Sequence, residues 1–155
     1  MKSAELPNRI LLVDDDRLML RLLTDMLESA GFEIRSSSNC KRTLALFDEF
    51  EPDCVLCDWE LPDAAGVDLV RHIRYVQQDR RPFIMMVSAH RSRNALELAL
   101  SAGANDFLSK PVKKEELLAR LAEAQRVRYL EKQLQILDDL GHLTVSHGYY
   151  SLYAS

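Results

Sequence analysis

The residues of this sequence that could do chemistry begin with Asp58, which directly follows the short apolar run Cys54–Cys57. Such a run predicts a buried strand, and Pro62 prevents regular structure from continuing far beyond it. Open α/β sheets bind their ligands outside the carboxyl ends of the strands. A carboxylate in that position is a candidate nucleophile, and we expect Asp58 to be the residue that reacts.

Other predicted strands also end in polar groups that could act together with Asp58. In chain order, these groups are Asp14-Asp15-Asp16, Ser88 and Lys110. The carboxyl ends of parallel strands lie at one edge of a sheet, so these side chains would converge without being adjacent in sequence. Carboxylates brought together repel, and a hard divalent cation with oxygen ligands relieves that repulsion, which favours Mg²⁺.

The chemistry that this group could perform is phosphoryl transfer. An aspartate whose charge is partly balanced can attack phosphorus and form an acyl phosphate. Lys110 would hold one phosphoryl oxygen and the Ser88 hydroxyl another, and phosphoryl transfer depends mainly on such positioning. Each residue also has a structural interpretation: Asp16 is expected to cap a helix, and Ser88 alone could belong to a turn. Their joint occurrence at the strand ends favours the chemical interpretation.

Five apolar strand patterns alternate with five helical patterns along the chain. The predicted strands are residues 10–13, 32–36, 53–58, 83–87 and 106–109. Gly31 and Gly103 are expected to end the first and fourth helices, and Asn39 to cap the second. This alternation predicts an α/β fold with right-handed crossovers, in which helices cover both faces of a parallel sheet.

Composition narrows the functional class. The 155 residues are enough for one domain with a short appendage, and the hydrophobic fraction of 47% allows a substantial core. A net charge of −4 gives no electrostatic support for nucleic-acid binding, and no apolar stretch is long enough for a signal peptide or a membrane span. We therefore expect a cytoplasmic protein that binds neither nucleic acid nor membranes.

The spacing of Cys54 and Cys57 superficially suggests a redox or metal pair. Residues three apart on a strand point to opposite faces of the sheet, so the two thiols would diverge. We expect both to be small buried hydrophobic residues.

A set of motifs resembles the receiver domain of bacterial response regulators over about residues 8 to 125. The motifs are Leu12-Val13-Asp14-Asp15-Asp16, Cys57-Asp58-Trp59-Glu60-Leu61-Pro62-Asp63 with Gly66, Val87-Ser88-Ala89, Ala102-Gly103-Ala104 and Ser109-Lys110-Pro111. The resemblance implies a flavodoxin-like, doubly wound, five-stranded parallel sheet with strand order 2-1-3-4-5. It also implies a cis peptide bond between Lys110 and Pro111.

The resemblance further implies that Asp58 accepts a phosphoryl group from a histidine kinase or a phosphotransfer protein. Asp15 would be a direct Mg²⁺ ligand, Asp14 a ligand through water, Asp58 a further ligand, and the Glu60 backbone carbonyl another. Such a domain is a phosphoryl acceptor, so the chain is not expected to be an enzyme.

The resemblance implies a conformational switch as well. Ser88 would follow the phosphoryl group, and Phe107 would turn inward on activation. Phe107 lacks the hydroxyl that a tyrosine carries at this position in some members, so its movement would depend on burial alone. Glu60 and His90 occupy the variable positions that flank the path of a hydrolytic water, which indicates an unusual phosphoryl lifetime.

The last helical pattern, from Lys113 to about Leu140, is longer than a receiver needs, at roughly 40 Å. Within it, Val127, Leu130, Leu134 and Leu137 are spaced like a coiled-coil seam. We therefore divide the chain into a receiver domain, residues 1–125, and an extended helix and tail, residues 126–155. The helix is predicted to form a homodimer or to lead to an output module such as a diguanylate cyclase; alternatively, it folds back on its own domain or belongs to a truncated chain.

Two other functions are compatible with parts of the sequence. Asp14-Asp15-Asp16 is similar to the nucleophile motif of haloacid-dehalogenase phosphatases, but Leu18 stands where that family has threonine or valine, and Asp58 is left unexplained. A receiver that serves only as an unphosphorylated dimerisation scaffold is the second alternative.

Overall fold

The strands and helices alternate along the chain as the sequence predicts, and the computed structural model describes residues 6–78, 81–89 and 92–144. The strands are β1 (Arg9–Val13), β2 (Glu33–Ser37), β3 (Cys54–Asp58), β4 (Phe83–Ser88) and β5 (Asp106–Ser109). The helices are α1 (Arg17–Ser29), α2 (Cys40–Phe50), α3 (Gly66–Val76), α4 (Arg93–Ala102) and α5 (Lys114–Thr144).

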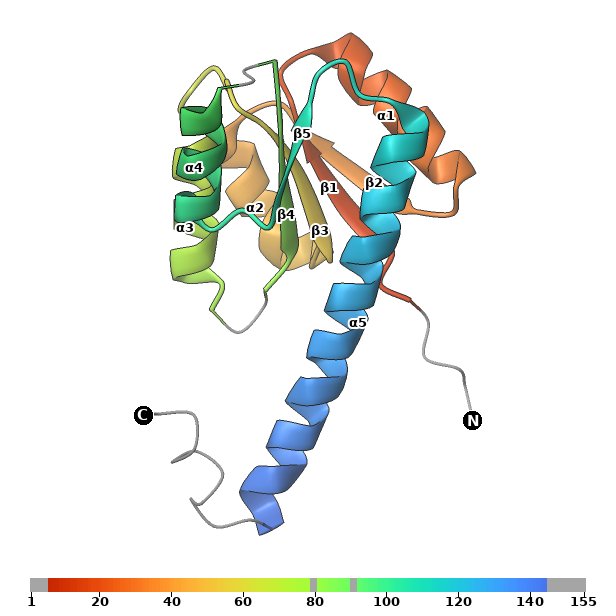
Figure 1. Cartoon of the computed structure of the whole chain (residues 1–155), viewed down its shortest axis with the longest axis vertical. Coiled ribbons are helices and arrows are strands. Elements are labelled where there is room, and N and C mark those ends of the chain that lie inside the picture. The colour runs from red at the N-terminus through yellow and green to blue at the C-terminus, as the bar shows by residue number, and fades with distance from the viewer. Residues whose placement is uncertain (1–5, 79–80, 90–91, 145–155) are drawn as a thin grey trace.

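All strand pairs are parallel, and the order β2-β1-β3-β4-β5 confirms the expected topology (Figure 1). In the register of the sheet, Val13 lies opposite Cys57, and Asp58 lies opposite Val87. The central strands β1, β3 and β4 are almost entirely buried, as their continuous apolar runs require of strands covered on both faces. Their carboxyl ends share one edge of the sheet.

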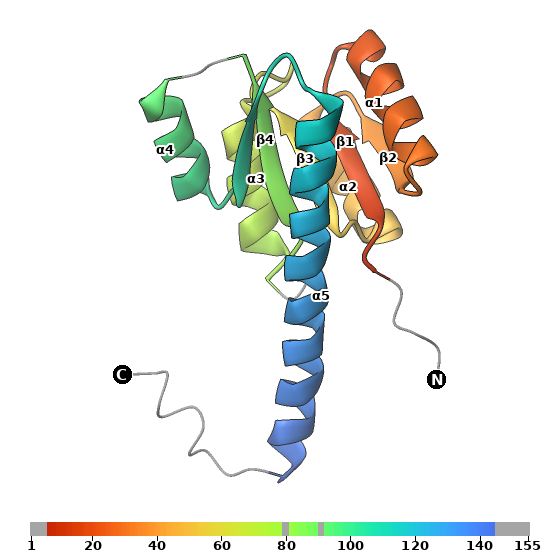
Figure 2. The ribbon, with the colours of Figure 1, turned by 45° about the vertical axis from the view of Figure 1, so that its right-hand side comes forward.

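Two hydrophobic cores lie on the two faces of the sheet. Helices α2, α3 and α4 cover one face, and α1 and α5 cover the other (Figures 1 and 2). Cys57 belongs to the first core and Cys54 to the second, which confirms that the two thiols diverge. Burial raises the pKa of both thiols, so they remain protonated and behave as hydrophobic side chains.

Local signals in the sequence fix the helix ends. The Asp16 carboxylate accepts hydrogen bonds from the backbone N–H groups of Leu18 and Met19 at 3.0 and 3.3 Å, so Asp16 is the N-cap of α1, as predicted. Asn39 caps α2 in the same way. Gly103 ends α4 in the left-handed region, with φ at 109°.

Helix α5 has two halves with different surroundings. Leu117, Leu121 and Ala124 in its first half are buried against the sheet. Its second half projects past the amino edge of the sheet (Figures 1 and 2), so the helix does not fold back over its own domain. Val127 still packs partly against the core, whereas the other three residues of the predicted seam are exposed: 53% for Leu130, 64% for Leu134 and 64% for Leu137.

The helix also continues through Gly141 to Thr144, four residues past the end that the sequence suggested. Most of the predicted tail, residues 145–155, lies outside the described residues. Within the described part of the chain, no helix is apolar over a length that would cross a membrane.

Polar contacts at the amino edge of the sheet hold α5 in place. The Lys132 ammonium lies 2.7 Å from the carboxylate of Asp53, which also accepts a hydrogen bond from the backbone N–H of Arg9 at 3.2 Å. The Gln125 amide donates to the backbone carbonyl of Pro7 at 2.9 Å. These contacts determine the direction in which α5 leaves the domain.

Candidate functional site

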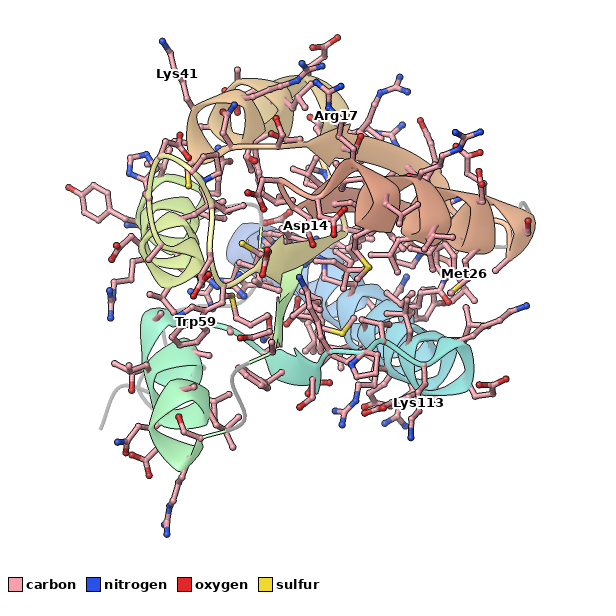
Figure 3. The ribbon with its side chains drawn as sticks, turned by 90° about the horizontal axis from the view of Figure 1, so that it is seen from above. Asp14, Arg17, Met26, Lys41, Trp59 and Lys113 are labelled. Carbon is pink, nitrogen blue, oxygen red and sulfur yellow. The ribbon has the colours of Figure 1, made fainter. Side chains whose placement is uncertain are left out.

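Three acidic side chains meet at the carboxyl edge of the sheet. Asp14 and Asp15 follow β1, Asp58 ends β3, and each offers a carboxylate oxygen within 4.8 Å of the other two. Seen from above, Asp14 lies near the middle of this edge, between the helix layers (Figure 3). The convergence predicted from the strand ends is therefore present in the structure.

The three consecutive aspartates, Asp14, Asp15 and Asp16, make different contacts and therefore have different roles. Asp14 is buried, and its Oδ1 accepts a hydrogen bond from the backbone N–H of Asp16 at 2.9 Å. The backbone N–H of Asp14 donates to the Ser37 carbonyl at 3.1 Å, which ties the acid to β2. Asp15 is exposed, and the Asp16 side chain is turned to α1 as its cap. Asp14 and Asp15 thus remain for the site.

Lys110 reaches the acids from the end of β5. Its ammonium lies 3.3 Å from Oδ2 of Asp14 and 3.4 Å from Oδ1 of Asp58. Its backbone N–H donates to the Ser88 carbonyl at 2.8 Å, and the peptide bond to Pro111 is cis, as the resemblance implied. This ammonium therefore contacts two of the three carboxylates, those of Asp14 and Asp58.

Three carboxylates meet at the site and the Lys110 ammonium contacts two of them, and this excess of acidic groups determines the electrostatics. Burial raises the pKa of Asp58, the nearby Asp14 raises it further, and Lys110 offsets only part of this. Burial of Lys110 disfavours its charge, but Asp14 and Asp58 outweigh this effect and raise the pKa of Lys110, which stays charged at neutral pH. The site therefore carries excess negative charge that a divalent cation could neutralise.

A cavity of about 340 Å³ opens over these groups. It is lined by Asp15, Asp58, Trp59, Glu60, Leu61, Pro62, Ser88, Ala89 and Lys110. Because Ser88 is buried and Lys110 only partly exposed, a small anion that enters would meet a hydroxyl and an ammonium on a largely desolvated wall. His90, the second residue predicted to flank this space, lies outside the described residues.

The loop from β3 to α3 forms one wall of the cavity and is closely held. Trp59 donates its backbone N–H to the Val87 carbonyl at 3.2 Å, and Gly66 donates to the Trp59 carbonyl at 2.7 Å. Glu60 pairs with Ala65 across the loop. A Cβ at Gly66 would collide with the backbone carbonyl of Asp58, so only glycine allows this close approach.

Asp63 anchors the same loop to a different helix, which the sequence gave us no reason to expect. Its two carboxylate oxygens accept hydrogen bonds from the backbone N–H groups of Cys40 and Lys41, at 2.9 and 3.1 Å. These bonds lower the pKa of Asp63. Asn39 accepts a hydrogen bond from one of the free N–H groups at the start of α2, and Asp63 accepts hydrogen bonds from two more. The one feature of the sequence that could have indicated this role of Asp63 is that Asn39 alone leaves the start of α2 incompletely capped.

Phe107, the predicted switch residue, lies on β5 beside the site. Its ring packs edge-on against Trp59, with a centroid distance of 6.3 Å and an interplanar angle of 67°. Both rings are partly buried against the core under α2, α3 and α4. Because Trp59 belongs to the loop that follows Asp58, a movement of the Phe107 ring would change the packing of that loop.

Known proteins with similar sequences are response regulators. Residues 10–122 match the response regulator receiver domain. The transcriptional regulatory protein CpxR of Klebsiella pneumoniae is 34% identical over 128 residues, which cover 83% of this chain and 53% of that protein. The phosphate regulon transcriptional regulatory protein PhoB of Pseudomonas aeruginosa is 32% identical over 118 residues, 76% of this chain and 51% of PhoB. The chain thus spans about half the length of these relatives.

Solved structures agree with the sequence matches. A CheY-like receiver domain protein from Methanospirillum hungatei superimposes with a TM-score of 0.74 at 28% identity, over 80% of this chain and 98% of that one. The BeF3-activated receiver domain of Klebsiella pneumoniae RstA gives a TM-score of 0.72 at 28% identity, over 77% and 99%. With the matched motifs, the strand order and the acidic edge, these similarities show that the chain belongs to the response regulator receiver domain family.

Proposed function

We propose that this chain is a phosphorylation-switched receiver of a two-component phosphorelay, in which Asp58 accepts a phosphoryl group from a histidine kinase or a phosphotransfer protein. The observation that carries the proposal is the position of Asp58: it lines the cavity, with the Lys110 ammonium 3.4 Å from its Oδ1. Membership of the receiver family supports the same assignment.

Asp14, Asp15, Asp58 and the backbone carbonyl of Glu60 would hold Mg²⁺, with Asp15 as a direct ligand and Asp14 acting through water. The fit rests on the donor set: the three carboxylates offer only oxygen atoms, and these atoms lie within 4.8 Å of one another. When bound, the cation neutralises the carboxylates and the incoming phosphoryl group.

In the transfer step, a carboxylate oxygen of Asp58 forms a bond to phosphorus as the bond from phosphorus to the donor's imidazole nitrogen breaks. The electron pair of the broken bond stays on that nitrogen. Lys110, at the same carboxylate, would hold one phosphoryl oxygen, and the Ser88 hydroxyl on the cavity wall another. The residues of the chain supply position and charge, and the cation that they would hold supplies further positive charge.

The haloacid-dehalogenase alternative requires Asp14 as the nucleophile. The burial of Asp14 and the hydrogen bond that its Oδ1 accepts from the Asp16 N–H count against it. Asp14 is also absent from the cavity lining, whereas Asp58 is part of it. The observed geometry therefore favours Asp58.

Phosphorylation would be transmitted by Ser88 and Phe107 to the surface and from there to α5. Ser88 would move toward the phosphoryl group, and Phe107, already in contact with Trp59, would turn further inward. We propose that the output is a change in homodimerisation through the exposed leucines of α5, or in a module that α5 joins to the receiver.

Intact mass measured after incubation with acetyl phosphate and Mg²⁺ tests the function, and light scattering on the same samples tests dimerisation. The wild type should gain one phosphoryl group and Asp58→Asn none. Asp53→Asn, directly before the start of the same strand, is the matched control and should be labelled like the wild type. A wild type that gains no phosphoryl group would support the unphosphorylated scaffold, and equal labelling of Asp58→Asn would refute the site.

A further inference from the structure

The exposed leucines of α5 face away from the domain that carries them. At about 100° per residue, Leu130, Leu134 and Leu137 form one stripe along the helix. Leu121 and Lys132, which face the sheet and its amino edge, lie on the opposite side of the helix. Figure 2 shows the second half of α5 standing clear of the other elements. A second copy could therefore approach this stripe without meeting the first copy's own domain.

Charged residues flank the stripe in an order that distinguishes parallel from antiparallel pairing. With Leu134 at heptad position a and Leu130 at d, Arg126 occupies position g and Glu131 position e. In a parallel pair, position g of one helix lies beside the following position e of the other, so Arg126 meets the oppositely charged Glu131. Two-fold symmetry forms this contact twice.

Antiparallel pairing that aligns the same leucines would instead place Glu131 opposite Glu131 of the second copy. Like charges in that position disfavour the arrangement. The charges of α5 are therefore complementary to a second α5 in only one of the two directions.

Both charged groups can be shared with a second copy. Arg126 is 69% exposed and contacts Glu123 on its own helix at 2.8 Å, and Glu131 contacts Arg128 at 2.8 Å. The exposed pair of Arg126 with Glu123 contributes little to stability, so it does not prevent a contact between helices. Glu131 is 43% exposed, although its partner Arg128 is only 12% exposed, so its carboxylate is still accessible to a second copy.

We propose that two copies of this chain pair through parallel, in-register α5 helices, with Arg126 of each copy against Glu131 of the other. The inference deepens the homodimer proposed above and rests on it. Parallel pairing places both receivers at the same end of the pair and brings the carboxyl ends of the two α5 helices together.

Single cysteine substitutions test the direction of pairing. Leu130→Cys and Leu134→Cys should each form a disulfide-linked dimer on mild oxidation, because equal positions face each other only in the parallel arrangement. Ile136→Cys is the control, since Ile136 is similarly exposed, at 52%, but lies off the stripe. The three native cysteines are buried, so the wild type should stay uncrosslinked.

Crosslinking that requires a mixture of the Leu130→Cys and Leu134→Cys proteins would show antiparallel pairing and overturn the inference while leaving the dimer intact. If the wild type stays monomeric by light scattering at all concentrations and the cysteine variants do not crosslink, both the parallel pairing and the homodimer itself would be overturned. Phosphoryl incorporation is measured separately by intact mass, so neither result bears on the role of Asp58.

Charge reversal tests the proposed ion pairs. Arg126→Glu and Glu131→Arg should each weaken dimerisation by about three- to tenfold, and the double variant should restore it. Residues five apart on one helix point in different directions, so restoration reports a contact between copies rather than within one. Single variants that dimerise like the wild type, or a double variant that stays weak, would overturn the proposed pairing.

Discussion

An aspartate lies at each edge of the sheet along strand β3: Asp53 directly precedes the strand and Asp58 is its last residue, and the two carboxylates have different surroundings. At the amino edge, Asp53 accepts hydrogen bonds from the Lys132 ammonium at 2.7 Å and the Arg9 backbone N–H at 3.2 Å. At the carboxyl edge, Asp58 shares the Lys110 ammonium with Asp14, at 3.4 and 3.3 Å. Both residues are aspartates at the two ends of one stretch of chain, but the balance of charge around them differs.

This difference distinguishes a carboxylate with a structural role, Asp53, from one at the candidate reactive site, Asp58. Asp53 has a cation of its own, and its contact fixes α5 against the domain. Asp58 lies among acids that outnumber the cation in contact with them, so the described site gains stability when further positive charge arrives. The buried strand between the two residues holds both in one rigid element.

Lys110→Met should have the largest effect, because it removes the ammonium on which the proposed transfer depends. The initial rate of phosphoryl incorporation from acetyl phosphate, with Mg²⁺ present, should fall by about 10²- to 10³-fold. Lys132→Met makes the same chemical change at the amino edge and should leave this rate near that of the wild type. Equal losses in the two variants would mean that the two edges do not differ as proposed.

Asp63→Ala should weaken Mg²⁺ binding by about tenfold, because the loop that carries the Glu60 carbonyl loses its attachment to α2. Trp59, the single tryptophan, adjoins Asp58, so its fluorescence can follow a Mg²⁺ titration. Asp68→Ala removes an equal charge from the exposed start of α3, where Asp68 pairs with Arg71, and serves as the control. Unchanged affinity in Asp63→Ala would show that the loop keeps its position without the anchor.

The contacts of Asp63 also mark the limit of prediction from the sequence. The strand ends and the caps at Asp16 and Asn39 depend on residues within a few positions of one another, and the sequence displays such patterns directly. The hydrogen bonds from the Cys40 backbone N–H to Asp63 and from the Lys132 ammonium to Asp53 join residues 23 and 79 positions apart, and no local sequence pattern predicts them. The convergence of Asp14, Asp58 and Lys110 is also long-range, but parallel topology predicts it.

The end of α5 shows a different limit. The sequence pattern predicted an end at about Leu140, directly before Gly141, yet the helix continues to Thr144. A glycine inside a helix costs only about 1 kcal/mol relative to alanine, which neighbouring helix-forming residues can offset. A glycine is therefore a reliable stop only where the backbone takes up the left-handed conformation, as at Gly103.

Lys132→Met should lower the free energy of unfolding by about 1 kcal/mol, because Asp53 would keep the Arg9 N–H but lose its cation. Urea denaturation followed by circular dichroism measures the change. Lys114→Met, in the exposed first turn of α5, is the matched control and should change stability by less. A loss as large in the control would assign the effect to helix α5 in general and not to the contact with Asp53.

Asp58→Asn should have the smallest effect on stability and the opposite sign. The folded-state pKa of Asp58 lies above its ordinary value of 3.8, so as the pH rises past that value the unfolded chain releases this proton before the folded protein does. The wild type therefore loses stability from this group as the pH rises above about 4, and the uncharged asparagine does not.

Without Mg²⁺ at neutral pH, Asp58→Asn should consequently melt at a higher temperature than the wild type, and this gain should disappear below about pH 4. Added Mg²⁺ should narrow or reverse the gain, because the cation stabilises the charged site of the wild type more than that of the variant. Asp53→Asn should melt below the wild type, since it gives up the ion pair with Lys132. If both substitutions shifted the melting temperature in the same direction, the two ends of β3 would not differ in charge balance, and the excess negative charge assigned to the carboxyl edge would be wrong.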